Sequence, residues 1–199
     1  LLPKDSQHIG GINFIEIQNL ELLHFLKILK TIQYQAVKGD TDINACWNLR
    51  KKGVGLLGNL PGTQQPIPFM EDTIVPPQYL SAYIAEITTL LQTHNLKYGM
   101  FGHVDVGCLH IRPALDMTCE EDRKKVRIIS DQVNTLVQKY QGSFCGEHGK
   151  GFRSEFTKVY FGNTLYKVLQ DIKKCFDPFN RLNPGKIVNA ESSDYVKID

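Results

Sequence analysis

The sequence lacks the features that mark several common protein classes. Its 23 basic residues are scattered among 21 acidic ones, so the net charge is only +2. Since no basic stripe with interleaved aromatic residues is present, a nucleic-acid-binding function is not expected. The longest apolar-rich stretch, residues 20–29, is interrupted by Glu21, His24 and Lys27. It is also too short to cross a membrane, so we expect no transmembrane segment.

The cysteine pattern and the first residues argue against further classes of protein. The five cysteines are odd in number and contain no C-x-x-C pair, which argues against a disulfide framework or a cysteine-based iron–sulfur or zinc site within this chain. A reducing compartment, the cytoplasm, fits best, with peripheral attachment to an inner membrane left open. The opening Leu1-Leu2-Pro3 has neither a methionine nor the pattern of a signal peptide, and we interpret it as a cut inside a longer protein.

Hydrophobic periodicity predicts an α+β fold, an antiparallel sheet flanked by helices. With 199 residues and 42% apolar content, the chain can bury a core. We expect residues 1–188 to form the domain and residues 189–199 to be a linker or tail. Strands are expected at residues 12–17, 35–38, 71–75, 98–104, 109–112 and 143–145. Helices are expected at residues 20–32, from an N-cap at position 42 to position 53, and at 77–94, 120–140 and 166–176.

Two histidines lie on either side of a predicted turn at residues 105–108. In that register His103 and His110 are direct cross-strand partners, whose Cβ atoms would be about 4.5–5.5 Å apart. Two imidazoles at this separation can share one cation. A turn of three residues would change the register and weaken the inference. Two unrelated histidines with ordinary hydrogen bonds are the alternative interpretation, because two ligands do not define a site.

A second candidate segment places Glu147 and His148 among three glycines. Gly146, Gly149 and Gly151 allow positive φ angles and a close approach of the backbone to a ligand. Two histidines and one carboxylate are a common catalytic metal-ligand set that leaves positions open for substrate. His148 could then act as a base. The alternative is a glycine-rich turn with solvated charges.

A third candidate is Arg50, which follows Trp47 on a predicted helix. An arginine beside a tryptophan can hold a carboxylate through two parallel hydrogen bonds. The alternative is a surface arginine whose stem packs on the core.

Three motifs, taken in order, resemble the signatures of one family. Residues 102–110 (GHVDVGCLH) resemble G-H-x-G-D-G-N-L-H, and residues 145–151 (CGEHGKG) resemble S-G-E-H-G-x-G. Residues 176–187 (FDPFNRLNPGKI) resemble F-D-P-x-x-x-L-N-P-G-K. These signatures belong to the C-terminal domain of FAD-linked oxidases of the vanillyl-alcohol oxidase superfold, which include D-lactate, glycolate and D-2-hydroxyglutarate dehydrogenases. The chain looks most like the large bacterial members that also carry an iron–sulfur domain.

The resemblance implies a ferredoxin-like cap domain and a dehydrogenase that transfers a hydride from a D-2-hydroxy acid to FAD. Its metal ligands fall on His103, His110 and Glu147. Its catalytic histidine falls on His148, and the arginine that holds the substrate carboxylate falls on Arg50. Zinc is the expected metal, while manganese and iron stay open because they accept the same ligands.

The resemblance also implies partners outside this chain. FAD would be bound mainly by an FAD-binding domain of the same polypeptide, with Asn183, Glu147 and Gly149 of this chain near the flavin. We therefore expect the fragment alone to bind FAD weakly and to be inactive. An iron–sulfur cluster is expected elsewhere in the full-length protein, and the electron acceptor is not defined.

Two departures from the family pattern bear on function. The Gly-Asp-Gly-Asn turn is replaced by residues 105–108, so any role of its aspartate or asparagine is lost. Arg112 stands where the family has asparagine, and we interpret this cation as a partner for a second substrate carboxylate. That favours 2-hydroxyglutarate over lactate. A metal-dependent hydrolase and a non-catalytic ligand-binding module remain alternatives, although neither explains the Leu-Asn-Pro-Gly-Lys segment.

Overall fold

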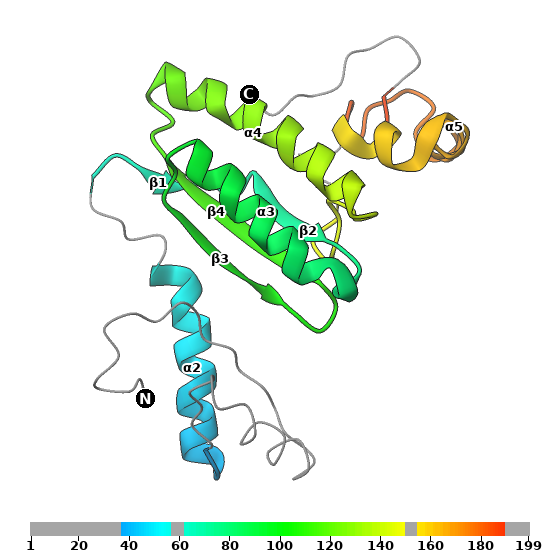
Figure 1. The fold of residues 1–199 in the computed structure, drawn as a ribbon. Coiled ribbons are helices and arrows are strands. Elements are labelled where there is room, and N and C mark those ends of the chain that lie inside the picture. Colours follow the sequence, from blue (N-terminus) through cyan, green and yellow to red (C-terminus); the bar gives the residue numbers. More distant parts are fainter. Residues whose placement is uncertain (1–36, 57–61, 150–154, 190–199) are drawn as a thin grey trace. The chain divides into compact units, whose positions relative to one another are not determined.

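The computed structural model describes residues 37–56, 62–149 and 155–189. These fall into two compact units, residues 1–59 and residues 60–199. The described part of the first unit is one helix, and the second unit holds the sheet and the other helices (Figure 1). The predicted strand at 12–17 and helix at 20–32 lie outside the described residues, as does half of the strand predicted at 35–38, and the described residues 37 and 38 form no strand.

The helix of the first unit is α2 (Asp40–Leu56). It begins two residues before the predicted N-cap, so Asp42 lies in its first turn, where a carboxylate favours the helix dipole. It also continues past Gly53, which was expected to end it. The helix itself is confirmed, and both predicted boundaries are wrong.

A four-stranded antiparallel sheet forms the centre of the second unit. Its central strand is β4, which pairs with all three others. Ile111 of β4 pairs with Met70 of β2 and with Met100 of β3, so these two strands lie along opposite edges of β4. This arrangement confirms the predicted α+β class. The strands are β1 (Gln65–Pro66), β2 (Met70–Ile74), β3 (Tyr98–His103) and β4 (Cys108–Leu115).

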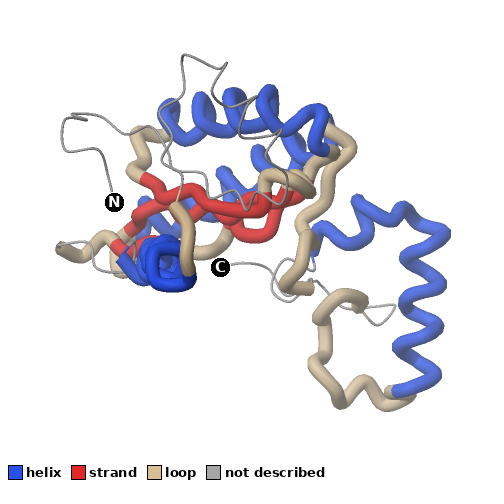
Figure 2. Tube along the Cα trace, turned by 90° about the horizontal axis from the view of Figure 1, so that it is seen from below, coloured by secondary structure: helices blue, strands red, loops and turns tan. Residues whose placement is uncertain are grey.

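Two helices cover one face of this sheet. The helix α3 (Leu80–Thr93) follows the 3-10 turn η1 (Pro77–Tyr79) and lies in front of the strands in Figure 1, and α4 (Glu120–Lys139) packs beside α3. In the perpendicular view of Figure 2 the strands (red) form a layer below the helical segment drawn at the top (blue). Both helices agree closely with their predictions. None of the described helices is long and apolar enough to cross a membrane.

Alternation along β4 assigns its side chains to two faces. Leu109, Ile111 and Leu115 are buried in the core beneath the helices. The intervening residues, which include Cys108 and His110, therefore point to the opposite face. The sheet thus separates a hydrophobic core from the face that carries the candidate site.

The segment after α4 differs from its prediction. Residues 143–145 form no strand, and Ser143 makes only an isolated bridge to Ile74. The last described helix, α5 (Thr157–Phe176), begins nine residues earlier than predicted and is interrupted at Gly162, where φ is +71°. The glycine breaks the helical periodicity, which is why only the second part of α5 was recognised.

The F-D-P motif ends α5 and organises the turn that follows. Backbone N–H groups of Arg181 and Leu182 donate to the Asp177 carboxylate at 2.9 and 2.8 Å. The Lys173 ammonium also donates to it, at 2.6 Å. The motif aspartate therefore fixes the course of the turn that follows α5.

Candidate metal centre and active site

The turn between the two histidines lies one residue earlier than predicted. His103 pairs with Cys108 and Phe101 pairs with His110, so the turn is formed by residues 104–107. The prediction that His103 and His110 are direct partners is therefore wrong. The error moves the partner of His103 by two positions along β4, so His103 and His110 still lie on the same face of the sheet. The histidines are diagonal neighbours, with ring centroids 6.0 Å apart and planes at 89°.

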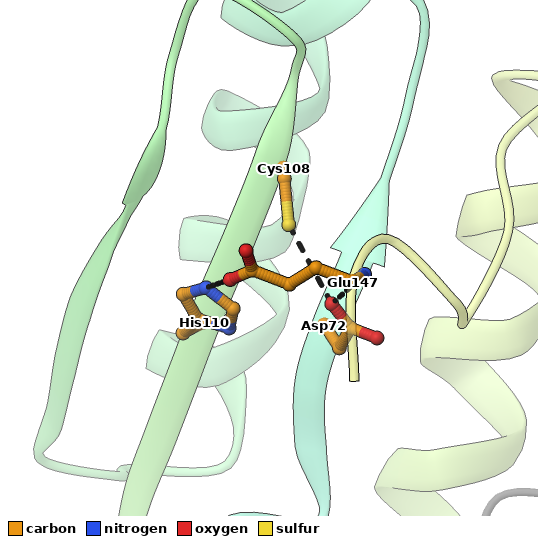
Figure 3. Close-up of side chains that lie close together, drawn as sticks. All are labelled: Asp72, Cys108, His110 and Glu147. Carbon is orange, nitrogen blue, oxygen red and sulfur yellow. Dashed lines mark hydrogen bonds and ion pairs between the residues drawn. The ribbon is translucent and has the colours of Figure 1, made fainter. Parts of the chain in front are cut away.

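One carboxylate oxygen stands among three imidazoles. Glu147 Oε1 lies 2.8 Å from His110 Nε2, 3.3 Å from His103 Nε2 and 3.4 Å from His148 Nε2. The His148 ring also stacks on His110, with centroids 4.8 Å apart and planes at 12°. Figure 3 shows Glu147 reaching from the loop after α4 to His110 on β4. The structure thus brings together the predicted metal ligands and the predicted base.

The cluster has a buried side and an open side. The His110 side chain is only 4% exposed, whereas that of His103 is 38% and that of Glu147 is 43% exposed. Burial lowers the pKa of His110, although the nearby Glu147 carboxylate acts against this effect. A neutral imidazole keeps a lone pair for a metal. A cavity of about 210 Å³ adjoins the open side and is lined by Ile74, His103, Asp105, Val106, Cys108, Gly146 and Glu147.

The contacts of Glu147 with His103 and His110 have separations close to those in a divalent metal site. Zinc bonds to imidazole nitrogen and carboxylate oxygen are about 2.0–2.2 Å long, so ligand atoms around one tetrahedral ion are separated by about 3.3 Å. The contacts from Glu147 Oε1 to His110 and His103 are 2.8 and 3.3 Å, which is close to this separation. Among the described residues, two groups have ligand atoms within 4.8 Å of one another, Asp72, Cys108, His110 and Glu147, and Glu71, His110 and His148, and His103 belongs to neither. A cation would offset the negative charge that the carboxylates gather here.

A bulge in β2 supplies two acidic residues that the sequence prediction missed. Met70 pairs with Ile111 but Thr73 pairs with Leu109, so β2 holds one extra residue between them. Asp72, in the bulge, has a φ of +69° and is fully buried. Its carboxylate oxygens accept the backbone N–H groups of residues 147 and 148. Two consecutive acidic residues inside a predicted strand were the available signal.

Comparison with known proteins identifies the family of the chain. The sequence matches the family described as FAD linked oxidases, C-terminal domain, over residues 16–187. The chain belongs to this family. It is 52% identical over 163 residues to a D-2-hydroxyglutarate dehydrogenase of Pantoea ananatis, and 50% identical over 170 residues to one of Escherichia coli. These alignments cover 82% and 84% of this chain, but only 16% and 17% of the relatives.

A more distant relative is a D-lactate dehydrogenase of Anaerostipes hadrus, 30% identical over 118 residues, which are 58% of this chain and 25% of that protein. Compared with the two D-2-hydroxyglutarate dehydrogenases, the chain spans about one-sixth of their length. It corresponds to the C-terminal domain of an FAD-linked oxidase.

Cys108 occupies the last position of the altered family turn. Its side chain is buried, and Sγ donates to Asp72 Oδ1 at 3.7 Å (Figure 3). Burial, together with the negative charges of Asp72 and Glu147, raises the pKa of the Cys108 thiol to about 12. The group is therefore a protonated thiol that packs between the strand and the Glu147 segment.

Arg112, the other departure from the family pattern, is held by an acidic neighbour. Its Nε and Nη2 donate to Glu71 Oε1 at 3.1 and 2.5 Å. The guanidinium also lies over the Phe101 ring, 5.4 Å from the centroid. Arg112 follows His110 by two residues on β4, so both side chains lie on the same face.

For the other predicted site residues, Arg50, Asn183 and Gly149, the structure shows the local surroundings. Arg50 is exposed on α2, with its guanidinium 5.7 Å from the Trp47 ring centroid, and α2 belongs to the other unit. Asn183 is exposed in a turn with a φ of +45° and accepts the Lys186 N–H through its carbonyl oxygen. Gly149 has a φ of +74°, as its glycine identity allows. Their contacts with substrate and flavin stay predictions.

Proposed function

We propose that the full-length protein is a flavin-dependent D-2-hydroxy-acid dehydrogenase that oxidises D-2-hydroxyglutarate to 2-oxoglutarate. The main support is the convergence of three imidazoles on one oxygen of Glu147, at the open side of an antiparallel sheet. The substrate class is supported by relatives about half identical in sequence that are named D-2-hydroxyglutarate dehydrogenases. In this proposal residues 1–188 are the substrate-binding cap domain.

The proposed metal ligands are His103, His110 and Glu147. A divalent ion, zinc by preference and manganese or iron as alternatives, would polarise the 2-hydroxyl group of the substrate and lower its pKa. His110 contributes a buried ligand whose ring is fixed between Phe101 and His148, with centroid distances of 5.0 and 4.8 Å. His103 and Glu147 contribute partly exposed ligands, which leave room for a substrate on the open side.

His148 is the proposed general base. Its ring is held by stacking on His110, and its Nε2 lies 3.4 Å from the Glu147 oxygen at the centre of the cluster. It would therefore lie within reach of a hydroxyl group bound at that centre and take its proton. FAD, held mainly by a separate domain of the same polypeptide, would accept the hydride from the substrate Cα.

The rest of the proposal extends to parts of the protein outside the described cluster. Arg50 would hold the substrate carboxylate, and Asn183 and Gly149 would lie near the flavin. An iron–sulfur cluster in the full-length protein would pass electrons to an acceptor that is still to be identified. A cytoplasmic location, with or without attachment at the inner membrane, belongs to the same proposal.

Arg112 is the proposed determinant of substrate choice. Glu71 accepts hydrogen bonds from Nε and Nη2, and Nη1 would bind the distal carboxylate of 2-hydroxyglutarate. A hydrogen bond to a charged group contributes about 1.5–3 kcal/mol. Replacing Arg112 with asparagine should therefore reduce kcat/KM for D-2-hydroxyglutarate about 10- to 100-fold more than for D-lactate. Equal losses for the two substrates would refute this assignment.

The decisive experiment is a dye-linked activity assay of the full-length protein on a panel of D-2-hydroxy acids, before and after metal removal. Chelation should abolish oxidation of D-2-hydroxyglutarate, and added metal should restore it. Glu147→Gln should lose activity and metal together. Glu86→Gln, which changes an exposed carboxylate paired with Lys139, is the matched control and should keep both. Activity that survives complete metal removal would contradict the proposal.

A further inference from the structure

We infer that Asp72 is the positioning residue that holds the Glu147–His148 segment in its active arrangement. The inference rests on the proposed function, since it assigns a role toward the same ligand and base. No motif contains this residue, although it lies in the strand predicted at 71–75. It lies 75 positions before Glu147 in the sequence.

Asp72 accepts hydrogen bonds from three consecutive backbone N–H groups. The Gly146 N–H donates to its carbonyl oxygen at 3.2 Å. The N–H groups of Glu147 and His148 donate to the two carboxylate oxygens, Oδ1 and Oδ2, at 2.8 and 3.0 Å. Residues 144–149 belong to no helix or strand, so regular secondary structure does not fix their course. Asp72 supplies this missing restraint.

The backbone of β2 is shaped to deliver this carboxylate. The extra residue between Met70 and Thr73 turns the Asp72 side chain to the site face, and its φ is +69°. Positive φ is uncommon for residues other than glycine, although aspartate and asparagine tolerate it best. A fully buried acidic residue in this conformation indicates a specific role for its side chain.

The fit between Asp72 and the segment leaves no free space. A Cβ added at Gly146 would lie 2.9 Å from Asp72 Oδ1 and 2.7 Å from Cys108 Sγ. Only glycine lets the backbone approach the carboxylate this closely. The glycine before the Glu-His pair is therefore explained by the contact with Asp72.

The same contacts distinguish the role of Asp72 from that of the proposed metal ligands. Its oxygens lie within 4.8 Å of ligand atoms on Cys108, His110 and Glu147, which by proximity alone would make it a ligand candidate. Each of its oxygens accepts a backbone N–H group of the Glu147–His148 segment, so the observed role of the carboxylate is to hold that segment. Asp72 therefore acts on the metal through Glu147, as an outer partner that orients a ligand.

Two variants of the full-length protein test this role. Asp72→Asn keeps the shape of the side chain and tolerates positive φ. Its amide NH2 group would face one of the two backbone N–H donors and could not accept that hydrogen bond. Asp72→Gly removes the side chain, and glycine adopts the positive φ at this position without strain. In both, we expect the metal dissociation constant, measured by competition with a chelator, to rise about 10- to 100-fold. Hydrogen–deuterium exchange should become faster at residues 146–148 and stay unchanged in β4.

Asp122→Asn is the matched control, because Asp122 is also buried and its carboxylate accepts the Asp116 N–H at 2.9 Å, away from the cluster. It should leave metal affinity and exchange at residues 146–148 unchanged. Wild-type metal affinity and wild-type exchange in both Asp72 variants would overturn the inference. Hydrogen–deuterium exchange at residues 146–148 tests the inference even if a variant or the wild type binds no metal. A wild-type protein that binds metal but oxidises no 2-hydroxy acid would instead refute the proposed function.

Discussion

Replacing Gly146 with alanine should weaken metal binding, although the added methyl group would touch no proposed ligand atom. The new Cβ would lie 2.7 Å from Cys108 Sγ and 2.9 Å from Asp72 Oδ1. The optimal separation between non-bonded heavy atoms is about 3.5–4.0 Å, so restoring it would move the segment or its neighbours by about 0.8 Å. Cys108 is 2% exposed and Asp72 is fully buried, which leaves the neighbours little room to withdraw.

A displacement of this size exceeds what a metal site tolerates. Glu147 follows Gly146 directly, and its Oε1 is only 2.8 Å from His110 Nε2. Productive geometry requires positions held within about 0.5 Å. We therefore expect the metal dissociation constant of Gly146→Ala to rise about 10- to 100-fold. Overpacking should also lower the free energy of unfolding by about 1–3 kcal/mol.

A second substitution separates crowding from other effects. Cys108→Ala removes Sγ, so in the double variant the shorter of the two close contacts disappears while the contact with Asp72 remains. The double variant should therefore recover part of the lost metal affinity. The assay is competition with a fluorescent chelator on the full-length protein. Equal affinities for the wild type and Gly146→Ala would refute the steric reasoning.

Two further predictions concern titration and reactivity. Lys173 and two backbone N–H groups lower the pKa of Asp177 from 3.8 to about 2, so its contribution to stability is present above pH about 4 and is lost as the pH falls toward 2. The difference in unfolding midpoint between wild type and Asp177→Asn should therefore shrink over that range, and a constant difference would contradict it. The pKa of Cys108, raised from 9.0 to about 12, reduces its thiolate fraction about a thousandfold. Alkylation followed by peptide mapping should label exposed Cys175 first, and equal labelling rates would count against this environment.

The shared face of the two histidines could be predicted although their register could not. Alternation of Leu109 and Ile111 fixes which residues of β4 enter the core, and His110 must then point the other way. Turn length is less constrained by sequence, and the turn lies one residue earlier than predicted. Because this error moves the partner of His103 by an even number of residues, the predicted side of the sheet was still correct.

The role of Asp72 could not be predicted, since it depends on a bulge and on a contact across 75 residues. Periodicity reports which face a residue occupies in a regular strand, and a bulge breaks that relation. The early start of α5 was missed for a similar reason, because Gly162 interrupts the helical pattern. Local patterns predicted the elements, whereas the supports of the site come from distant residues that only the folded chain brings together.

The most direct measurement of the central claim is anomalous X-ray diffraction from crystals of the full-length protein, recorded on both sides of the absorption edge of the bound metal. One anomalous peak is expected about 2.0–2.2 Å from His103 Nε2, His110 Nε2 and a Glu147 carboxylate oxygen. The peak should be absent in crystals of Glu147→Gln. A metal bound elsewhere, with these three side chains making no contact to it, would contradict the claim.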